Sequence, residues 1–456
     1  INIDNVDINN IFKTAIDKIN FTGCSLDSRV IKKGNIFFAY KGKKNNGNQY
    51  IAEAKKNGAI LAIVERKNLK VKIPQIKVKN AHSALIKLAK YSRLKSSAKI
   101  IAITGSVGKT STKDAFAHIL KQEKKIFTAR KSFNNLFGVP LEILNMPKNT
   151  KIGIFELGMN HRNELTKLVE ILKPQIGVIL NIDYVHGGNF NDIKDIARAK
   201  AEIINSKFPV NTIILNKDCN HFKMISDKAK KVKIEKIITY SMNKKANLTY
   251  CSHTKKNSNL VVEVTLNKEK IIKYKINSIN DYLIGNTMAI IASLEATGLN
   301  INLIKNLKNL KLTEGRGDII KFKKFNKIIE LHNHSYNSSP ISLFSGLSVF
   351  LKISNKKNLI IIGDMNELGN KSEYYHLKVL KFLSKNNNDN HLMVGKIFYK
   401  YKNRFISEKI NFFQNVNHLN DKISDLIKFH NRIFIKGSNS IDLQKTVNFI
   451  ESNLVN

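Results

Sequence analysis

The sequence predicts an α/β protein built from three domains, and three observations support this prediction. The chain has 456 residues, which is too long for one ordinary hydrophobic core and enough for about two to four domains. Short apolar runs alternate with helical stretches along most of the chain, as expected for sheets whose strands are covered by helices on both faces. A glycine-rich turn at residues 103–113 joins an apolar run to a helix, which is typical of a nucleotide-binding α/β domain.

Residues 1–95 are predicted to form a small α/β domain. Apolar runs at 36–39 and 60–64 have the length of short buried strands, and a helical stretch at 50–57 lies between them. An amphipathic stretch at 83–94 predicts a second helix, and the Lys- and Ser-rich residues that follow it are typical of a joint between domains.

Residues 96–313 are predicted to form a central domain with a mainly parallel sheet. Between 231 and 280 the pattern changes to short alternating segments, which favours an antiparallel side sheet. Residues 282–297 are rich in Ala and Ile and predict a helix, with Gly298 at its end. The apolar runs that fit the strands of the parallel sheet lie at 100–103, 152–157, 176–182 and 211–215.

Residues 314–456 are predicted to form a third, doubly wound α/β domain of the Rossmann-like type. Its apolar runs at 359–362 and 432–435 are separated by helical segments such as 373–383. An Asn-rich run at 386–390 predicts an exposed loop.

Composition narrows the class of protein. Hydrophobic residues make up 42% and charged residues 25% of the chain, as in ordinary globular proteins. No apolar run reaches the length of a membrane span, the first residues lack a signal-peptide pattern, and the three cysteines are scattered. These features predict a cytoplasmic protein without a disulfide framework.

The net charge of +42 invites a nucleic-acid-binding interpretation, because lysine-rich surfaces bind phosphate backbones. The lysines are however spread over the full length and interleaved with Asn and Ile, and neither a nucleic-acid-binding motif nor a tryptophan accompanies them. The pattern therefore indicates a global bias of composition, and we expect no specific nucleic-acid partner.

The turn at 103–113 carries the clearest chemical signal. Gly105 and Gly108 allow backbone N–H groups to curl around phosphate oxygens, Lys109 can reach the terminal phosphates, and the Thr110 hydroxyl can hold Mg²⁺. The spacing is shorter than the usual P-loop pattern, because Ile103 stands where its first glycine would fall. The alternative is a structural turn with an incidental lysine. The residues predicted to bind nucleotide here are Gly105, Ser106, Val107, Gly108, Lys109, Thr110 and Ser111.

Further polar clusters lie at predicted strand ends, where open α/β sheets bind their ligands. Taken singly, each is compatible with an ordinary turn or helix cap, and a lone His or Lys is more often structural than catalytic. The clusters are Glu156 to Asn160, Asn181 to His186, Lys200 with Glu202, Gly315-Arg316-Gly317, Ser335 to Pro340, and Gly363 to Gly369 with His376.

In this order and spacing, the clusters resemble the Mur ligase family over about residues 20–445. The most specific segments are Thr104–Thr110, Phe133–Pro140, Glu156–Asn160, Ala199–Glu202, Ser335–Asn337 and Gly363–Gly369. The Asn-Asn and Gly-Asp-Met segments point to the branch of the family that adds D-alanyl-D-alanine to UDP-N-acetylmuramoyl-tripeptide.

The resemblance implies three domains, for UDP-substrate binding, ATP binding and ligation, in a monomer that uses ATP and Mg²⁺ to form an amide through an acyl phosphate. Implied catalytic residues are Lys109, Lys200 and His186, and implied Mg²⁺ ligands are Thr110, Glu156, His186 and a carbamylated Lys200. Asn286 and Arg316 are implied to contact ATP. The implied substrate-binding residues are Ser25, Ser28, Arg29, Asn134, Asn135, Asn160, Tyr336, Asn337, Asp364, Glu367 and His376.

Several positions depart from the family pattern, which puts nucleotide affinity in doubt. The family's Asp-Asp is Asn333-His334 here, and an Arg near the C-terminus and a His before Asn286 are Asn439 and Tyr282. Asn46 and Asn48 replace an Asp and a His of the N-terminal domain.

Three alternatives therefore stay open. One is a sister enzyme, either another Mur-type or a folylpolyglutamate synthetase-like ligase. Another is a basic P-loop NTPase stimulated by nucleic acid, and the third is a binder that has lost catalysis.

Overall fold

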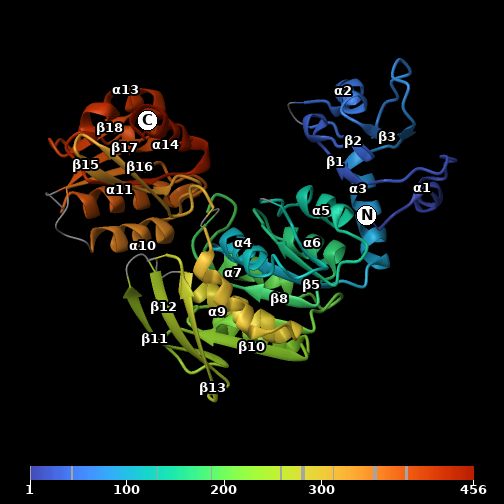
Figure 1. The fold of residues 1–456 in the computed structure, drawn as a ribbon, viewed down its shortest axis with the longest axis horizontal. Helices are drawn as coiled ribbons and strands as arrows, with labels where there is room; N and C mark the ends of the chain where they lie inside the picture. Colours follow the sequence, from blue (N-terminus) through green and yellow to red (C-terminus); the bar gives the residue numbers. More distant parts are fainter. Residues whose placement is uncertain are drawn as a thin grey trace.

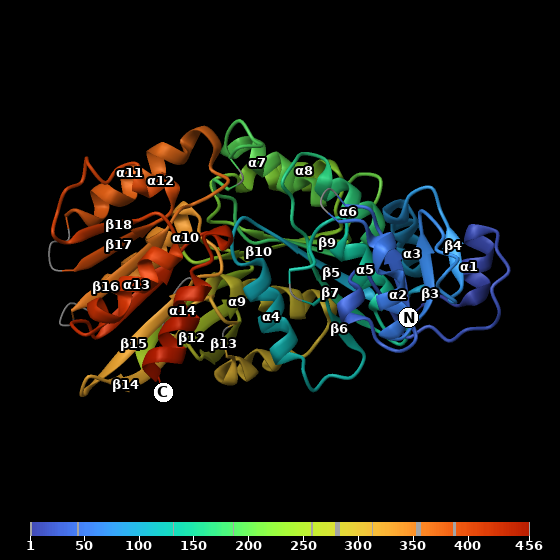
Figure 2. The same ribbon diagram turned by 90° about the horizontal axis from the view of Figure 1, so that it is seen from above.

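The structure, a computed structural model, describes residues 2–42, 45–130, 132–185, 187–256, 259–278, 283–311, 313–352, 357–385 and 389–455. Three sheets lie in succession along the chain, one in each predicted domain. Figure 1 shows the N-terminal and C-terminal domains rising from the same side of the central domain, and Figure 2 shows the three domains in a row. The α/β fold class with three domains is confirmed.

The N-terminal sheet is parallel, with strand order β1-β2-β3-β4. Alternate side chains of β2 face opposite layers: Ile36 and Phe38 pack toward α3, and Phe37 packs toward α2. The elements are α1 (Asn5–Phe12), β1 (Gly23–Ser25), β2 (Asn35–Ala39), α2 (Ile51–Lys56), β3 (Ala59–Val64), β4 (Gln75–Lys77) and α3 (Ala81–Lys95).

The central sheet has strand order β13-β12-β11-β10-β9-β8-β5-β7-β6. Ile101 and Ile103 of β5 pack against α4 and α9 on one face, and Ile100 and Ala102 face the opposite core with α3, α5 and α6. The elements are β5 (Lys99–Thr104), α4 (Lys109–Ile119), β6 (Ile126–Thr128), α5 (Gly138–Asn145), β7 (Ile152–Glu156), α6 (Glu164–Leu172), β8 (Ile176–Ile179), α7 (Ile193–Lys200), β9 (Thr212–Asn216), α8 (Phe222–Lys231), β10 (Lys236–Ser241), β11 (Leu248–Lys256), β12 (Asn259–Leu266), β13 (Lys270–Ile276) and α9 (Leu283–Thr297).

The antiparallel strands predicted over 231–280 are present as β11, β12 and β13, but they do not form a separate side sheet. β10 pairs in parallel with both β9 and β11, so the antiparallel strands extend the main sheet. A change in local patterning showed the switch in strand direction, but it could not show that hydrogen bonding continues across it.

The C-terminal sheet has strand order β14-β15-β19-β16-β17-β18, with β14 antiparallel and the others parallel. α13 and α14 cover one face, and α10, α11 and α12 cover the other. The elements are β14 (Asp318–Lys324), β15 (Lys327–His334), α10 (Pro340–Leu351), β16 (Asn358–Gly363), α11 (Ser372–Leu383), β17 (Asn390–Val394), α12 (Lys396–Tyr399), β18 (Ile410–Phe413), α13 (Val416–Ile427), β19 (Arg432–Lys436) and α14 (Gln444–Ile450).

This arrangement places two sheet edges close to the functional segments. In the central domain, the carboxyl ends of β5, β7 and β8 lead into the segments with the phosphate-binding turn, Glu156 and Asn181. In the C-terminal domain the chain order reverses between β16 and β19, which is where doubly wound sheets bind ligands. The Asn-rich loop predicted at 386–390 falls partly outside the described residues.

Candidate active site

The phosphate-binding turn has the predicted strand, glycine-rich turn and helix. β5 ends at Thr104, and α4 begins at Lys109 directly after Gly108. Gly108 has φ +87, and a Cβ there would lie 2.8 Å from the side-chain oxygen of Asn286. The left-handed backbone conformation favours glycine at this position, and the Asn286 side chain packs directly against it. The first N–H groups of α4 have no partner within the helix and carry its partial positive charge, which suits a phosphate.

A neighbouring loop holds the turn in shape. The Ser106 N–H donates to the Asn181 carbonyl at 3.0 Å, and the Val107 N–H donates to the Asn181 side-chain oxygen at 2.9 Å. The Asn181 amide nitrogen donates back to the Val107 carbonyl at 3.1 Å. The Ser106 hydroxyl accepts from the Asp183 N–H at 2.8 Å. Two amides predicted to face phosphate are therefore bonded to this loop, a role of Asn181 that the sequence alone did not reveal.

Two lysines meet at one carbonyl oxygen of the turn. Lys109 and Lys200 both donate from Nζ to the Gly105 carbonyl, at 2.7 and 3.1 Å. Lys200 is 2% exposed at the end of α7. Burial holds the pKa of Lys200 well below its ordinary value, and the neighbouring Lys109 lowers it further. Burial also lowers the pKa of Lys109. Burial therefore disfavours the charged form of Lys200.

Glu156 lies at the end of β7, where side chains from two other elements meet its carboxylate. The Thr110 hydroxyl donates to Oε2 at 2.7 Å, and the Asn134 amide donates to Oε1 at 2.6 Å. Glu156 and Thr110 are 2% and 7% exposed. Hydroxyl and carboxylate oxygens fit a hard cation such as Mg²⁺, which commonly takes one or two protein carboxylates together with substrate phosphates. Among the described residues, no three or more His, Cys, Asp or Glu side chains come together as a metal-binding cluster.

His186 and Tyr282 lie outside the described residues. The metal role predicted for His186 therefore stays a prediction.

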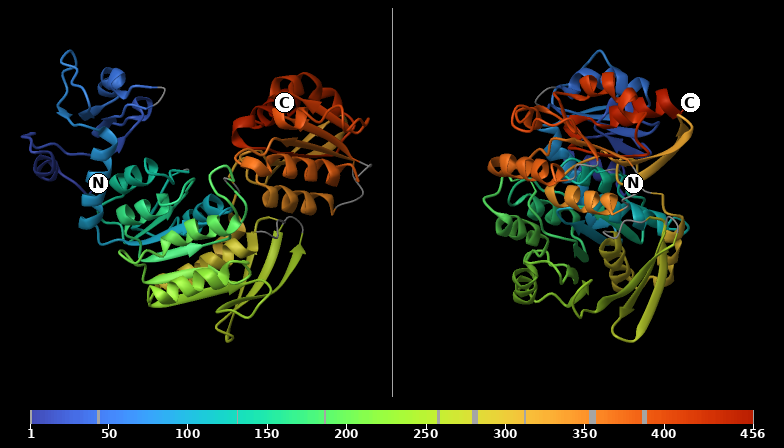
Figure 3. Two further views of the ribbon diagram at one scale, coloured as in Figure 1. Left: turned by 180° about the vertical axis from the view of Figure 1, so that it is seen from behind. Right: turned by 90° about the vertical axis from the view of Figure 1, so that its left-hand side faces the viewer.

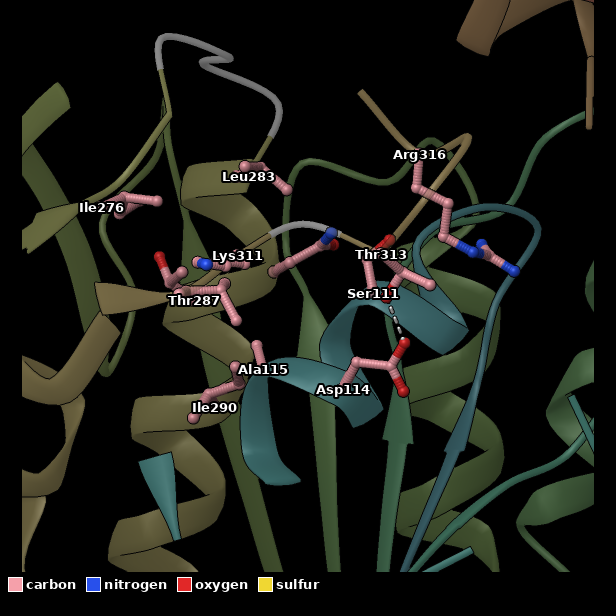
Figure 4. Close-up of a pocket in the computed structure, with 12 residues that line it drawn as sticks. Ser111, Asp114, Ala115, Ile276, Leu283, Thr287, Ile290, Lys311, Thr313 and Arg316 are labelled. Carbon is pink, nitrogen blue, oxygen red and sulfur yellow. Dashed lines mark hydrogen bonds between the residues drawn. The ribbon is translucent and has the colours of Figure 1, made fainter. Parts of the chain in front are cut away.

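A shallow pocket opens beside the first turns of α4. Its walls are mostly apolar and come from α4, α9 and the end of β13, and Asn286 lines it where it adjoins Gly108. Figure 4 shows Arg316 at the rim and the Thr313 hydroxyl bonded to Asp114, at 2.7 Å. A flat apolar ring with hydrogen-bonding edges, next to a phosphate-binding turn, is the ligand that such a pocket suits.

Arg316 and Tyr336 bring the C-terminal domain to this site. The Arg316 guanidinium stacks 3.8 Å from the centre of the Tyr336 ring, and the Tyr336 hydroxyl lies 2.8 Å from the Ser132 hydroxyl of the central domain. Lys436, at the end of β19, donates to the Asn337 carbonyl at 2.9 Å. Burial and the nearby Arg316 lower the pKa of Lys436 to about 7. The predicted residues Arg316, Tyr336 and Asn337 therefore come together.

Comparisons with known proteins agree with this geometry. The Mur ligase catalytic domain pattern matches residues 20–93, and the Mur ligase middle domain pattern matches residues 103–294. The UDP-N-acetylmuramoyl-tripeptide–D-alanyl-D-alanine ligase of Rickettsia prowazekii is 33% identical over 450 residues, which cover 95% of this chain and 96% of that protein. This chain belongs to the Mur ligase family.

Other relatives extend the likeness. The ligase of the same name from Escherichia coli K12 is 28% identical over 380 residues, 83% of this Mur ligase and 82% of that protein. A crystal structure of MurF from Acinetobacter baumannii superposes with a TM-score of 0.84 at 25% identity, covering 97% of this chain and 98% of that one.

In the C-terminal domain of this Mur ligase, two predicted substrate-binding residues face inward. Asp364 is 2% exposed and accepts the Ile397 and Phe398 N–H groups at the start of α12, at 2.8 and 2.9 Å. His376 is fully buried: its Nε2 accepts the Met365 N–H at 3.0 Å, and its Nδ1 lies 2.7 Å from a backbone carbonyl. Both side chains thus support the loop after β16, which favours a positioning role over direct substrate contact.

The polar groups of three other predicted substrate residues are also engaged locally. Ser25 and Ser28 donate to the Asp27 carbonyl and the Glu53 carboxylate, at 2.9 and 2.6 Å. The Asn135 side-chain oxygen accepts the Phe137 and Gly138 N–H groups just before and at the start of α5. These side chains shape their loops, and a ligand would have to share or displace these hydrogen bonds.

Arg29, Asn160 and Glu367 are exposed, so a ligand can reach them. Arg29 forms a two-pronged pair with Asp27, with its nearest nitrogen–oxygen distance 2.7 Å. The Asn160 N–H donates to the Glu164 carboxylate at 2.7 Å.

The departures from the family pattern have structural consequences. Asn333 is fully buried and donates at 3.2 Å to Asp318, which lies opposite it on β14. A carboxylate at 333 would face the Asp318 carboxylate, so an amide suits this chain. Asn439 is exposed, and the Asn46 side-chain oxygen accepts from Asn48 at 3.0 Å.

Proposed function

We propose that this chain is an ATP-dependent ligase that adds D-alanyl-D-alanine to UDP-N-acetylmuramoyl-tripeptide in peptidoglycan precursor synthesis. The observation that carries the proposal is the alignment with the Rickettsia ligase of that name, at 33% identity over 95% of the chain. Alignment at this level over all three domains covers the substrate-binding and the ATP-binding parts together. The same alignment argues against the two alternatives, a sister ligase and a basic nucleic-acid-stimulated NTPase.

The reaction forms and breaks bonds in two steps. The tripeptide carboxylate attacks the γ-phosphorus of ATP, which forms an acyl phosphate and releases ADP. The amine of D-alanyl-D-alanine then attacks the acyl carbon, releasing phosphate and a proton. The first step needs alignment and neutralisation of phosphate charge more than covalent help from the protein. Lys109 and the N–H groups at the start of α4 supply both, once Lys109 turns from the Gly105 carbonyl to a phosphate.

Thr110 and Glu156 would hold Mg²⁺, and the ion would neutralise charge on the ATP phosphates. Their buried oxygens, 2.7 Å apart, support this assignment. Predicted second-site ligands are His186 and a carbamylated Lys200. Carbamylation joins a neutral amine to CO₂ and releases one proton, and burial favours the neutral amine at Lys200. The Lys109 ammonium at the same carbonyl would stabilise the new negative charge.

The pocket beside α4 is proposed to bind the adenosine part of ATP. Asn286 would recognise the edge of adenine, and Arg316 would reach the phosphates from the C-terminal domain. The apolar walls and the short distance from Asn286 to Gly108 support this arrangement.

The remaining assignments follow the family. We propose domain limits at 95/96 and 313/314, UDP-substrate binding in the N-terminal domain, and action as a cytoplasmic monomer. Ser25, Ser28 and Arg29 would take part in binding the UDP part of the substrate. Further proposed substrate-binding residues are Asn134, Asn135, Asn160, Tyr336 and Asn337, and Asp364, Glu367 and His376 would lie near the dipeptide or tripeptide. No helix in the described part of the chain combines the length and apolarity that crossing a bilayer requires.

The test is phosphate release from ATP in the presence of UDP-N-acetylmuramoyl-tripeptide, with and without D-alanyl-D-alanine. We expect release only when both substrates are present, with a matching amide product by mass. Turnover with glutamate and a folate, but none with D-alanyl-D-alanine, would identify a sister ligase. ATP hydrolysis driven by DNA or RNA and suppressed by salt would favour the nucleic-acid alternative.

A further inference from the structure

The loop that follows β8 touches the phosphate-binding turn with one end and the C-terminal domain with the other. We call residues 181–184 and 187–188 the bridging loop. At its start, Asn181 and Asp183 bond to Ser106 and Val107 of the turn, at 2.8–3.1 Å. Its last residues lie against the loop between β16 and α11 of the C-terminal domain. In Figure 3, the segment before α7 reaches toward that domain.

Gly369 is the closest point of this contact. It has φ +54, and a Cβ there would lie 2.7 Å from the Gly187 carbonyl oxygen and 2.7 Å from the Gly188 Cα. These are backbone atoms of the central domain, which cannot rotate away as a side chain can. Glycine at 369 therefore allows the two domains to meet backbone to backbone.

Tyr184 is a buried residue of the bridging loop that also contacts the C-terminal domain. It is 3% exposed, and its hydroxyl points to the Leu368 carbonyl at 3.5 Å. The Lys371 ammonium lies 4.6 Å from the centre of the Tyr184 ring, and the Tyr375 ring lies 5.9 Å away. A cation over an aromatic face and a shared apolar contact both favour the docked arrangement.

We propose that the bridging loop couples docking of the C-terminal domain to the shape of the phosphate-binding turn, with Asn181, Tyr184 and Gly369 as positioning residues. Only two residues lie between Asn181, which bonds to the turn, and Tyr184 in the domain contact, so a displacement of either residue shifts the other. Thermodynamic linkage then requires nucleotide binding and domain docking to strengthen each other. The inference rests on the proposed function for the identity of the reaction, but not for the coupling itself.

The first test compares Gly369→Ala with Gly298→Ala in the full chain. Both glycines have positive φ, +54 and +76, so both variants carry similar backbone strain. A Cβ at Gly298 meets nothing within 4 Å, so only Gly369→Ala disturbs the contact between domains. By equilibrium titration with ADP, we expect Gly369→Ala to bind at least about five-fold more weakly than the wild type. Gly298→Ala should stay within about two-fold.

Lys371→Gln is a milder second variant, because it removes the cation over Tyr184 without adding a clash. We expect about two- to five-fold weaker ADP binding, with unchanged thermal unfolding. A double-mutant cycle then tests whether the two ends act together: Asn181→Ala combined with Gly369→Ala should weaken ADP binding by less than the product of the two single effects.

The coupling is overturned if Gly369→Ala and Gly298→Ala bind ADP equally well, or if the Asn181 and Gly369 effects multiply independently. ADP binding needs neither peptide substrate, so this result is separate from the proposed function. A wild type that ligates D-alanyl-D-alanine without the difference between glycine variants would refute only the coupling. A wild type that turns over another substrate and shows the difference would refute only the proposed function.

Discussion

The carboxyl edges of the central and C-terminal sheets carry similar sequence patterns but use them differently. In both domains a carboxylate follows a buried strand and a glycine lies close by: Glu156 with Gly158, and Asp364 with Gly363. Glu156 meets side chains from two other elements beside the phosphate-binding turn. Asp364 accepts backbone N–H groups of its own domain. An acidic residue at a strand end is therefore not by itself evidence of a catalytic role, because the elements packed around it decide which partners its oxygens meet.

Lys109 gives the most direct test that the edge of the central sheet is catalytic. We expect Lys109→Ala to lower kcat by at least about 10²-fold, because it removes the side chain proposed to bind the transferred phosphate. Steady-state phosphate release measures the effect, and thermal unfolding should be nearly unchanged. Lys121→Ala, an exposed lysine just beyond α4, is the matched control. Near-normal turnover in Lys109→Ala would refute the assignment.

A substitution at Lys200 tests whether its buried amine is also needed for catalysis at the edge of the central sheet. We expect Lys200→Ala to lose on the order of 10²-fold in kcat, the size of effect when one electrostatic group is removed. Short-chain carboxylic acids should restore part of the activity if a carbamate is what the site lacks. Lys194→Ala, exposed on the same helix, should behave as wild type. Loss without any rescue would point to a packing role for Lys200.

A substitution at Asp364 tests whether the carboxylate at the edge of the C-terminal sheet serves stability and not catalysis. Asp364→Asn places an amide N–H₂ toward backbone N–H donors, so we expect a loss of about 1–3 kcal/mol in the free energy of unfolding. Activity per folded molecule should fall much less than in Lys109→Ala. Urea unfolding and kcat measured on the same samples separate the two, with the exposed Asp425→Asn as control. A large fall in kcat at unchanged stability would place Asp364 in direct contact with substrate.

The smallest expected effect is a pH dependence of the free energy of unfolding that arises from Lys436. Its pKa of about 7 in the folded protein lies below the ordinary value of 10.5. The unfolded chain therefore binds more protons between pH 7 and 10.5, and this group's contribution to stability rises with pH through that window. Lys436→Met removes the buried charge, so its stability relative to wild type should be higher at pH 6 than at pH 8, by about 1–2 kcal/mol. Lys445→Met, an exposed lysine, should show no such difference, and equal values at both pH would mean that Lys436 titrates normally.

Much of the site could be predicted because its residues share one stretch of chain. The turn from Gly105 to Thr110 combines glycine conformations, a helix start and a lysine within a few residues, and each property is local. Asn181 was missed as a partner of that turn, because its hydrogen bonds to Val107 span 74 positions. The inward orientation of His376 was missed for the same reason, since burial depends on which elements pack around α11.

The sequence by itself determined the α/β class, the three domains and the phosphate-binding turn, because apolar periodicity and glycine conformation act over a few residues. Only the tertiary structure decided that the antiparallel strands extend the main sheet, that Lys109 and Lys200 share the Gly105 carbonyl, and that Gly369 lies on the backbone of Gly188. Each of these joins segments far apart in the chain. Such contacts are selected by packing and hydrogen bonding of the whole molecule, which no local pattern records.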